Sequence, residues 1–301
     1  AAIQLWLMPL ICLLEGCNQI FQVNRFKFIQ IILEGLVAWI LFLLGGGLWV
    51  LVGILMVRVT TSATFLFINY YQFFRSIWIA PIIDQVNWRN KIWPMQWRLA
   101  IQGAFNYFAN NAFVPVMFHF HGATIAGQVG MTLQLISTIM IISIIWVQTK
   151  VPKLGTYVVQ QKFSDLNQIW LRFSTLSFLS ATFMGMVLLA IVVFLNIYGY
   201  ELSNRVLSPE LLFVFLISFS LLQISDYQSM YLRAFAREAF LYQGVLTGVS
   251  VGLAVYIFGG KFGAIGASYS HLAITVGFAL PVSSYIWYSK KKAWIQELSS
   301  K

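Results

Sequence analysis

A few polar and charged side chains interrupt long apolar stretches in this sequence, and Arg58 is the most unusual of them. It lies about ten residues into its stretch, which on an α-helix is a depth of roughly 15 Å. A charge at the centre of a bilayer costs a few kcal/mol, so such a residue usually faces a cavity, an ion-pair partner or an anionic ligand. Two roles therefore stay open for Arg58: anion binding in a cavity, or an ion pair with Glu15 or Glu34 that joins helices.

Amide side chains recur along one apolar stretch, residues 99–118. Gln102, Asn106 and Asn110 follow the spacing i, i+4, i+8, which places them on one helix face, and Asn111 flanks them. Amides on one face can bind sugar hydroxyls in an aqueous lumen, so these four residues are candidate substrate ligands. The alternative is interhelical hydrogen bonding, worth under about 1 kcal/mol for each bond.

Three titratable residues lie in or beside the apolar stretches. His271 is a further candidate substrate ligand, although a neutral imidazole that is hydrogen-bonded in a core fits the sequence equally well. Asp226 and Glu15 are candidate sites for a coupling proton or cation, because carboxylates within a membrane are often ion or proton relays. The alternative for both carboxylates is an ion pair with a nearby arginine.

Little in the sequence points to an enzyme. The patterns HExxH and P-loop are missing, and His119 and His121 are poorly spaced to share a metal ion on a helix. Residues 248–252 (GVSVG) match Gly-x-Ser-x-Gly, but they lie inside the predicted span 238–258 and not at the strand-to-helix turn that this motif needs. Cys12 and Cys17 both fall in the first apolar stretch, which makes a structural disulfide improbable. We therefore predict no catalytic residue, no metal, no cofactor and a protein that is not an enzyme.

Composition predicts the elements that carry these residues. The chain of 301 residues is 59% hydrophobic and only 9% charged, which is too apolar for a soluble domain. We predict an all-α integral membrane protein with about nine transmembrane helices, since a helix needs about 20 residues to cross about 30 Å of hydrocarbon. The predicted spans are 2–20, 28–45, 48–74, 99–118, 122–148, 170–196, 210–231, 238–258 and 263–288.

The loops between these spans differ in positive charge. If the spans alternate in direction, all but Arg58, Arg205 and Lys261 of the 19 Lys and Arg residues lie on one side. The positive-inside rule makes that side cytoplasmic, and with it the C-terminus. The net charge of +10 is scattered through short loops, so membrane lipids are expected partners and nucleic acid is not.

Two segments, 28–65 and 241–278, align with each other. The alignment predicts two helical hairpins of the same orientation, each closed by a tight glycine turn, and thus a parallel repeat of the kind found in some transporters. It pairs Arg58 with His271 at a similar depth. The other matched residues include Gln30 with Gln243, Gly46-Gly47 with Gly259-Gly260, and Gly53 with Gly266.

The repeat also predicts how the chain is organised. Residues 99–288 would form a six-helix lobe, and residues 1–74 the last three helices of a partner lobe. Residues 75–98 would be a cytoplasmic or interfacial linker, and 289–301 a basic cytoplasmic tail. Because the chain opens inside an apolar stretch without Met or a charged leader, we expect earlier spans to be absent.

Three places in the sequence are similar to one known family. They are residues 148–152 (QTKVP) with 162–165 (KFSD), residues 259–267 (GGKFGAIGA), and residues 14–16 (LEG) followed by Arg25. Together they resemble polysaccharide flippases of the Wzx type, in the multidrug/oligosaccharidyl-lipid/polysaccharide exporter superfamily. The resemblance covers the whole chain.

The resemblance implies a transporter of about twelve helices in two six-helix lobes, located in the bacterial inner membrane. Such a protein flips undecaprenyl-pyrophosphate-linked oligosaccharide, the repeat unit of O-antigen or capsule, by alternating access. The implied partners are this lipid-linked oligosaccharide, a polysaccharide polymerase and a chain-length regulator. Two alternatives stay open: a drug/cation exporter of the same superfamily, and a membrane enzyme of polysaccharide assembly such as a polymerase or ligase.

Overall fold

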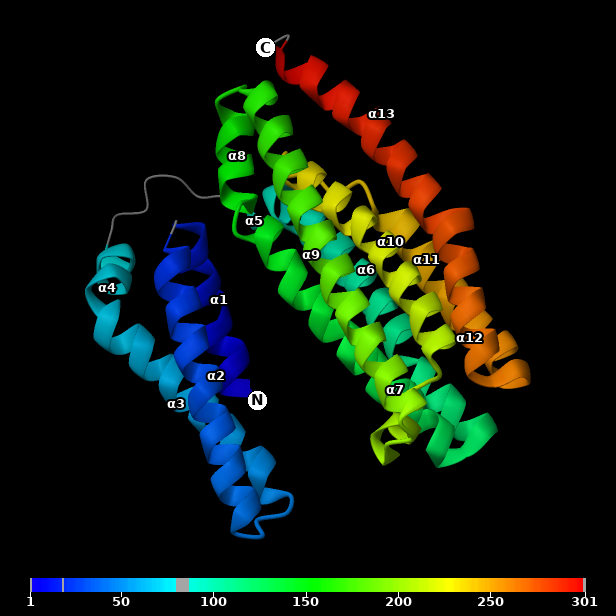
Figure 1. Ribbon diagram of the computed structural model, residues 1–301. Helices are drawn as coiled ribbons and strands as arrows, with labels where there is room; N and C mark the ends of the chain where they lie inside the picture. Colours follow the sequence, from blue (N-terminus) through cyan, green and yellow to red (C-terminus); the bar gives the residue numbers. More distant parts are fainter. Residues whose placement is uncertain (1, 18, 80–86, 300–301) are drawn as a thin grey trace. The chain divides into compact units, whose positions relative to one another are not determined.

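The chain is helical throughout the residues that the structure describes, which are 2–17, 19–79 and 87–299. The computed structural model shows no strand in these ranges, which confirms the predicted all-α class (Figure 1). The chain divides into two compact units, Ala1–Val86 and Asn87–Lys301, here called unit 1 and unit 2 and described separately. Residues 80–86 of the predicted linker lie outside the described residues.

Unit 1 is built on a helical hairpin of α2 (Ile20–Leu43) and α3 (Trp49–Asn69). In the turn between them, Gly45 and Gly47 have φ of 72° and 48°, a left-handed conformation that glycine adopts without a steric penalty. The hairpin core includes the stacked rings of Phe26 and Phe65, whose centroids are 4.2 Å apart. The other helices of the unit are α1 (Ala2–Gly16), which packs against both, and α4 (Tyr71–Ile79).

Unit 2 is a bundle around α10 (Pro209–Arg233), which packs against α7, α9, α12 and α13. Buried polar side chains tie α10 to its neighbours: Gln223 Nε2 donates to Ser143 Oγ at 2.8 Å, and the Tyr227 hydroxyl donates to Ser177 Oγ at 2.7 Å. Such bonds satisfy polar groups that lipid could not solvate. The other elements are α5 (Trp88–Lys91), α6 (Trp93–Asn111), α7 (Phe113–Gln148), α8 (Val151–Val159), α9 (Phe163–Ile197), η1 (Glu201–Arg205), α11 (Leu241–Ala254), η2 (Val255–Gly259), α12 (Gly260–Ile274), η3 (Thr275–Ala279) and α13 (Leu280–Ser299).

Two long helical stretches of unit 2 are interrupted by a glycine. Gly122 within α7 has φ 84° and ψ 178°, and Gly263 within α12 has φ 64° and ψ −145°. Side-chain-bearing residues rarely adopt these conformations, so each glycine ends one helix and starts the next (Figure 1). With these breaks, every predicted span overlaps a helix of the structure. The number of membrane crossings, nine, stays a prediction.

The glycine turn predicted for the second hairpin is wrong in its position. Gly259 and Gly260 lie inside a helix, with φ of −65° and −62°, and the turn falls at Gly263. A Cβ atom on Gly259 would lie 2.7 Å from Met117 Cε, and one on Gly260 would lie 3.2 Å from the Phe120 ring. The two glycines therefore serve close packing against α7, not chain reversal.

The matched pair Gly53 and Gly266 does have a common environment. A Cβ atom on Gly53 would collide with the Leu41 side chain, and one on Gly266 would collide with the carbonyl oxygen of Phe258. In each case the obstacle belongs to the other helix of the same hairpin. The parallel repeat itself stays a prediction.

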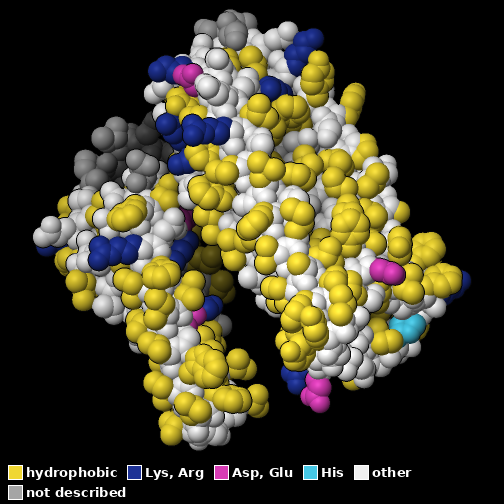
Figure 2. Space-filling view, in the orientation of Figure 1, with side chains coloured by type: hydrophobic (Ala, Val, Ile, Leu, Met, Phe, Trp, Pro, Cys, Tyr) yellow, Lys and Arg dark blue, Asp and Glu magenta, His cyan; other side chains and the backbone are white. Residues whose placement is uncertain are grey.

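The outer surfaces of the helices are strongly apolar. In α2 and α3, only 11% of the most apolar segment is buried inside the protein. Figure 2 shows hydrophobic side chains along the helices, and Lys and Arg gathered at the end of unit 2 near the C-terminus. Lipid is the solvent that accepts such a surface, so the chain is a multi-pass membrane protein. Six helical stretches among the described residues are long and apolar enough to cross a membrane: Ile20–Leu43, Trp49–Asn69, Trp93–Val159, Phe163–Ile197, Pro209–Arg233 and Leu241–Leu298.

Candidate functional site

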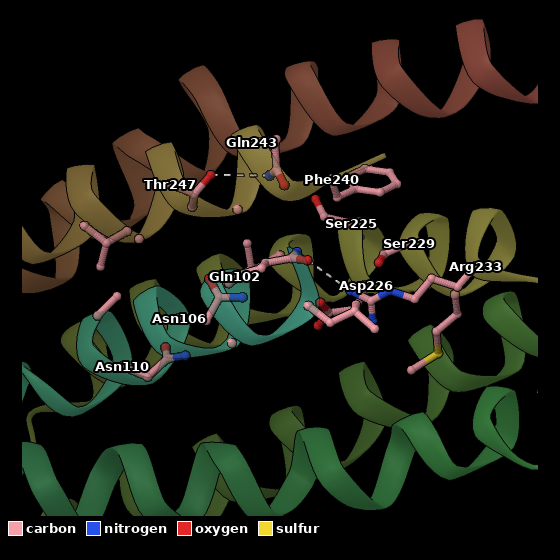
Figure 3. A pocket seen from close by; sticks show the side chains of 18 of the residues that line it. Gln102, Asn106, Asn110, Ser225, Asp226, Ser229, Arg233, Phe240, Gln243 and Thr247 are labelled. Carbon is pink, nitrogen blue, oxygen red and sulfur yellow. Dashed lines mark hydrogen bonds between the residues drawn. The ribbon is translucent and has the colours of Figure 1, made fainter. Parts of the chain in front are cut away.

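A polar cavity of about 560 Å³ lies inside unit 2 (Figure 3). Its walls come mainly from α6, α10 and α11, with further lining residues from α7 and α12. This volume is within the range of about 300–1,000 Å³ that is usual for small-molecule sites. A polar hollow inside an otherwise apolar bundle is the natural place for a ligand or a permeating molecule.

Glycine residues of α11 bring this helix close to α6. A Cβ atom on Gly244 would lie 2.5 Å from Gln102 Cγ, and one on Gly248 would lie 3.0 Å from the carbonyl oxygen of Phe105. Small residues one helical turn apart allow two backbones to approach in this way. The close approach holds Gln102 between the two helices at the cavity wall.

The amide face of α6 forms one wall of the cavity. Gln102, Asn106 and Asn110 all line it; Gln102 is buried, while Asn106 and Asn110 are exposed to the hollow. Asn111 is not among the lining residues, and its Nδ2 donates to the carbonyl oxygen of Tyr107 at 2.8 Å. The helical spacing read from the sequence thus corresponds to three side chains on one wall, with Asn111 turned to its own helix.

One face of α10 forms another wall of the cavity. Asp226, Ser229 and Arg233 follow the spacing i, i+3, i+7 and all line the cavity (Figure 3). Asp226 is exposed to the hollow and makes no hydrogen bond or ion pair with another residue in the described ranges. The Ser229 hydroxyl is buried and likewise has no hydrogen-bond partner among the described residues.

Arg233 is held by a network that includes a buried carboxylate. Its Nε donates to Glu238 Oε2 at 2.7 Å, and its Nη2 donates to Gln102 Oε1 at 3.1 Å. The Glu238 side chain is 0% exposed, and its other oxygen accepts the backbone N–H of Phe240 at 2.8 Å. Each oxygen of the buried carboxylate therefore has a donor, and the Arg233 charge is compensated.

His271 lies on α12 beside the same cavity and is almost completely buried. Its Nδ1 is hydrogen-bonded to Ser218 Oγ. The rings of Phe113, Phe215 and Phe219 surround the imidazole, the closest centroid being 4.8 Å away. This environment favours the interpretation of His271 as a hydrogen-bonded core histidine, although it also contributes to the cavity lining.

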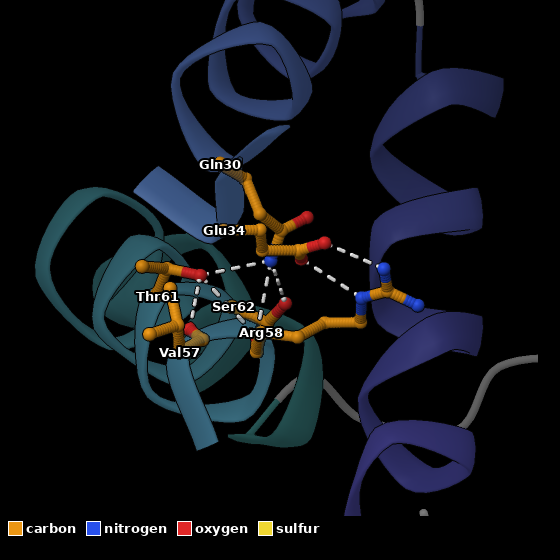
Figure 4. A network of polar contacts seen from close by, with 6 residues as sticks. All are labelled: Gln30, Glu34, Val57, Arg58, Thr61 and Ser62. Carbon is orange, nitrogen blue, oxygen red and sulfur yellow. Dashed lines mark hydrogen bonds and ion pairs between the residues drawn. The ribbon is translucent and has the colours of Figure 1, made fainter. Parts of the chain in front are cut away.

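Arg58 belongs to a separate polar network in unit 1 (Figure 4). Its Nε and Nη2 donate to the two carboxylate oxygens of Glu34 at 2.8 and 2.6 Å. Gln30 Nε2 donates to Thr61 Oγ1 at 2.8 Å and to the Arg58 carbonyl oxygen at 3.0 Å, which joins α2 to α3. The ion pair with Glu34, one of the two roles considered for Arg58, is therefore present. The Arg58 side chain is still 44% exposed.

Glu15 forms an ion pair of its own in unit 1. Its Oε1 accepts from Lys27 Nζ at 2.6 Å, and both side chains are partly exposed. The alternative considered for Glu15 was an ion pair with a nearby arginine. The structure shows an ion pair, but its cation is a lysine. Of the two candidate coupling residues, only Asp226 lies in the cavity.

The structure brings together cavity residues that the sequence did not single out. The sequence predicts Arg233 only as a loop cation and Gln243 only as a matched residue of the repeat, and it predicts no role for Ser229 or Thr247. Their spacing carries a signal, because Asp226, Ser229 and Arg233 share one helix face, as do Gln243 and Thr247 at i and i+4. That signal becomes useful once α10 is known to extend to Arg233.

Among the described residues, no group of three or more His, Cys, Asp and Glu is placed to hold a metal ion. Comparisons with protein-family models, curated proteins and solved structures found no match to this chain.

Proposed function

We propose that this protein is a transporter, and not an enzyme, which flips undecaprenyl-pyrophosphate-linked oligosaccharide across the bacterial inner membrane by alternating access. The observation that carries the proposal is the cavity lined by Gln102, Asn106 and Asn110 within a bundle of apolar helices. Amides offer both donors and acceptors, which suits the hydroxyls of a glycan. The lipid tail of the substrate would stay in the bilayer.

Arg58 is our candidate contact for the pyrophosphate group. Glu34 occupies its Nε and Nη2, while Nη1 makes no hydrogen bond to another described residue. A half-exposed guanidinium with a free donor can still bind a phosphate oxygen. Asp226 is our candidate for the coupling proton or cation.

The test of the proposal is the sidedness of the lipid-linked oligosaccharide in cells that depend on this protein for surface polysaccharide. The double variant Asn106→Leu/Asn110→Leu removes two polar cavity groups, and we expect at least about a tenfold loss of surface polysaccharide, with substrate retained in the cytoplasmic leaflet. The matched control is Asn196→Leu, the same change at an exposed position of α9. Normal surface polysaccharide in the double variant would refute the proposal.

Arg58→Ala gives a second, independent arm of this experiment. It removes the candidate phosphate ligand, so substrate should again accumulate in the cytoplasmic leaflet. Lys27→Ala, which removes the cation of the exposed pair with Glu15, is the control and should transport normally. Equal transport by both variants would remove Arg58 from the substrate path.

A second candidate function is export of cationic drugs, and one observation favours it. The cavity contains a carboxylate, Asp226, that makes no hydrogen bond or ion pair with another described residue, and the Arg233 cation that attracts it is bonded to Glu238. A lumen of this kind attracts cations. Asp226-dependent resistance to cationic antibiotics, with unchanged surface polysaccharide, would establish this function instead.

A further inference from the structure

The charged groups at the cavity of unit 2 have a net negative formal charge. Asp226 and Arg233 are its charged lining residues, and Arg233 is paired with the fully buried Glu238 carboxylate. The remaining titratable lining residue, His271, is held by Ser218 among aromatic rings. With Arg233 and Glu238 cancelling each other, the formal charge of Asp226 is left over, and it faces the hollow.

A second polar group beside Asp226 also lacks a partner. Ser229 is 7% exposed, lines the cavity, and its Oγ makes no hydrogen bond to another described residue. Buried hydroxyl groups without a partner are uncommon in folded proteins. Ser229 lies one helical turn after Asp226 on the same face of α10, and Asn106 projects into the same cavity from α6 (Figure 3).

We propose that Asp226, Ser229 and Asn106 form a subsite for a primary ammonium group, with an amino sugar as the matching glycan unit. An ammonium group has three N–H donors and no acceptor. Asp226 and Asn106 present a carboxylate oxygen and an amide carbonyl oxygen to the cavity, and the buried Ser229 hydroxyl is a third acceptor, one helical turn from Asp226. The inference rests on the proposed function, because the ammonium group would belong to the transported glycan.

Other ligands fit these three residues less well. A phosphate group would be repelled by Asp226 and would find the nearest guanidinium already paired with Glu238. A divalent metal ion would find a single carboxylate and no group of three or more ionisable ligands among the described residues. A neutral sugar could bond to the amides but would lose the charge-assisted hydrogen bond, which is roughly twice as strong as a neutral one.

The test is ligand-observed NMR on the full chain in lipid nanodiscs, with D-glucosamine, D-glucose, N-acetyl-D-glucosamine and methylammonium as probes. We expect D-glucosamine to bind about tenfold more tightly than the two uncharged sugars, since a hydrogen bond to a charged group adds roughly that factor. Asp226→Asn should abolish the preference, and Ser229→Ala should reduce it. Asp165→Asn, the same change at an exposed position in the first turn of α9, should keep it.

Each variant counts as folded if its size-exclusion elution volume and its thermal unfolding match those of the unchanged protein. If Asp226→Asn does not fold, Ser229→Ala is the variant that tests the subsite. Three results would overturn the subsite. They are equal binding of the three sugars, a preference for D-glucosamine that persists in folded Asp226→Asn, and no binding of any probe. Equal, Asp226-independent binding of the sugars would leave glycan recognition standing. Methylammonium binding that requires Asp226, without binding of any sugar, would support the ammonium subsite and contradict the proposed glycan function.

Discussion

At the scale of single residues, Arg233 and Arg237 differ in how deeply the carboxylate that pairs with each of them is buried. Glu238, the partner of Arg233, is completely buried, whereas the pair of Arg237 with Glu297 leaves both side chains 40% or more exposed. In the exposed pair, the hydrogen bonds that Arg237 donates to the Glu297 carboxylate raise the pKa of Arg237 above its usual value. An exposed pair gains little from its Coulomb attraction, while a buried carboxylate depends on its partner.

This contrast predicts a difference in stability. Arg233→Met would leave the Glu238 carboxylate buried without its cation and should lower the free energy of unfolding by about 3–5 kcal/mol. Arg237→Met should lower it by at most about 1 kcal/mol. Reversible unfolding in mixed detergent micelles measures both changes. Similar losses in the two variants would contradict the assignment of Glu238 as a buried, compensated group.

The sequence predicts the cavity residues that share one helix face, but not those whose role depends on contacts between distant segments. The spacing of Gln102, Asn106 and Asn110 predicts one face, and that face is a cavity wall, because helical periodicity is a local property. The role of Arg233 could not be predicted in this way, because it depends on a carboxylate beyond the helix end and on Gln102 of a distant helix. Similarly, only the packing of three phenylalanine rings distinguishes a core His271 from an exposed ligand.

At the scale of elements, glycines determine how helices meet and where they reverse. The all-α class and the extent of most helices follow from composition and apolar length, which the sequence shows directly. The position of the second hairpin turn does not, because Gly259, Gly260 and Gly263 are equally permissive in sequence. Which of them turns the chain depends on the side chains of Met117 and Phe120 from α7.

This interpretation predicts opposite effects for two glycine substitutions. Gly266→Ala would place a Cβ atom against the Phe258 carbonyl oxygen and should destabilise the protein by about 1–3 kcal/mol. Gly252→Ala, in α11 with open space around it, should be neutral or stabilising by up to about 1 kcal/mol. Thermal unfolding of the two variants in the same detergent provides the comparison. A loss of stability in Gly252→Ala equal to that in Gly266→Ala would refute the role of close packing.

At the scale of the whole molecule, both units have apolar outer surfaces and contain buried polar side chains. Because six stretches are long and apolar enough to span lipid, the loops that connect them lie on two aqueous sides of the membrane. Which side is cytoplasmic stays a prediction of the charge bias. The number of crossings, the parallel repeat and the transported substrate stay predictions as well, since length and hydropathy do not specify them.

The charge bias predicts the location of two points on the chain. Green fluorescent protein fused to the C-terminus should fluoresce, while alkaline phosphatase fused there should be inactive, because the C-terminus is predicted to be cytoplasmic. Alkaline phosphatase fused after Asn204, in the loop of Arg205, should be active. The reverse pattern at both positions would invert the proposed orientation.

The proposed transport path requires that the cavity beside Asn106 is open to water inside an apolar bundle. The most direct test is the reactivity of Asn106→Cys toward a charged, membrane-impermeant thiosulfonate, in a background with Cys12→Ser and Cys17→Ser. Leu246→Cys, on the exposed apolar surface of α11, is the control. Because the thiolate is the reactive form and requires water, Asn106→Cys should be modified and Leu246→Cys should not. An unreactive Asn106→Cys that only a lipid-soluble maleimide modifies would contradict an aqueous cavity and the transport path built on it.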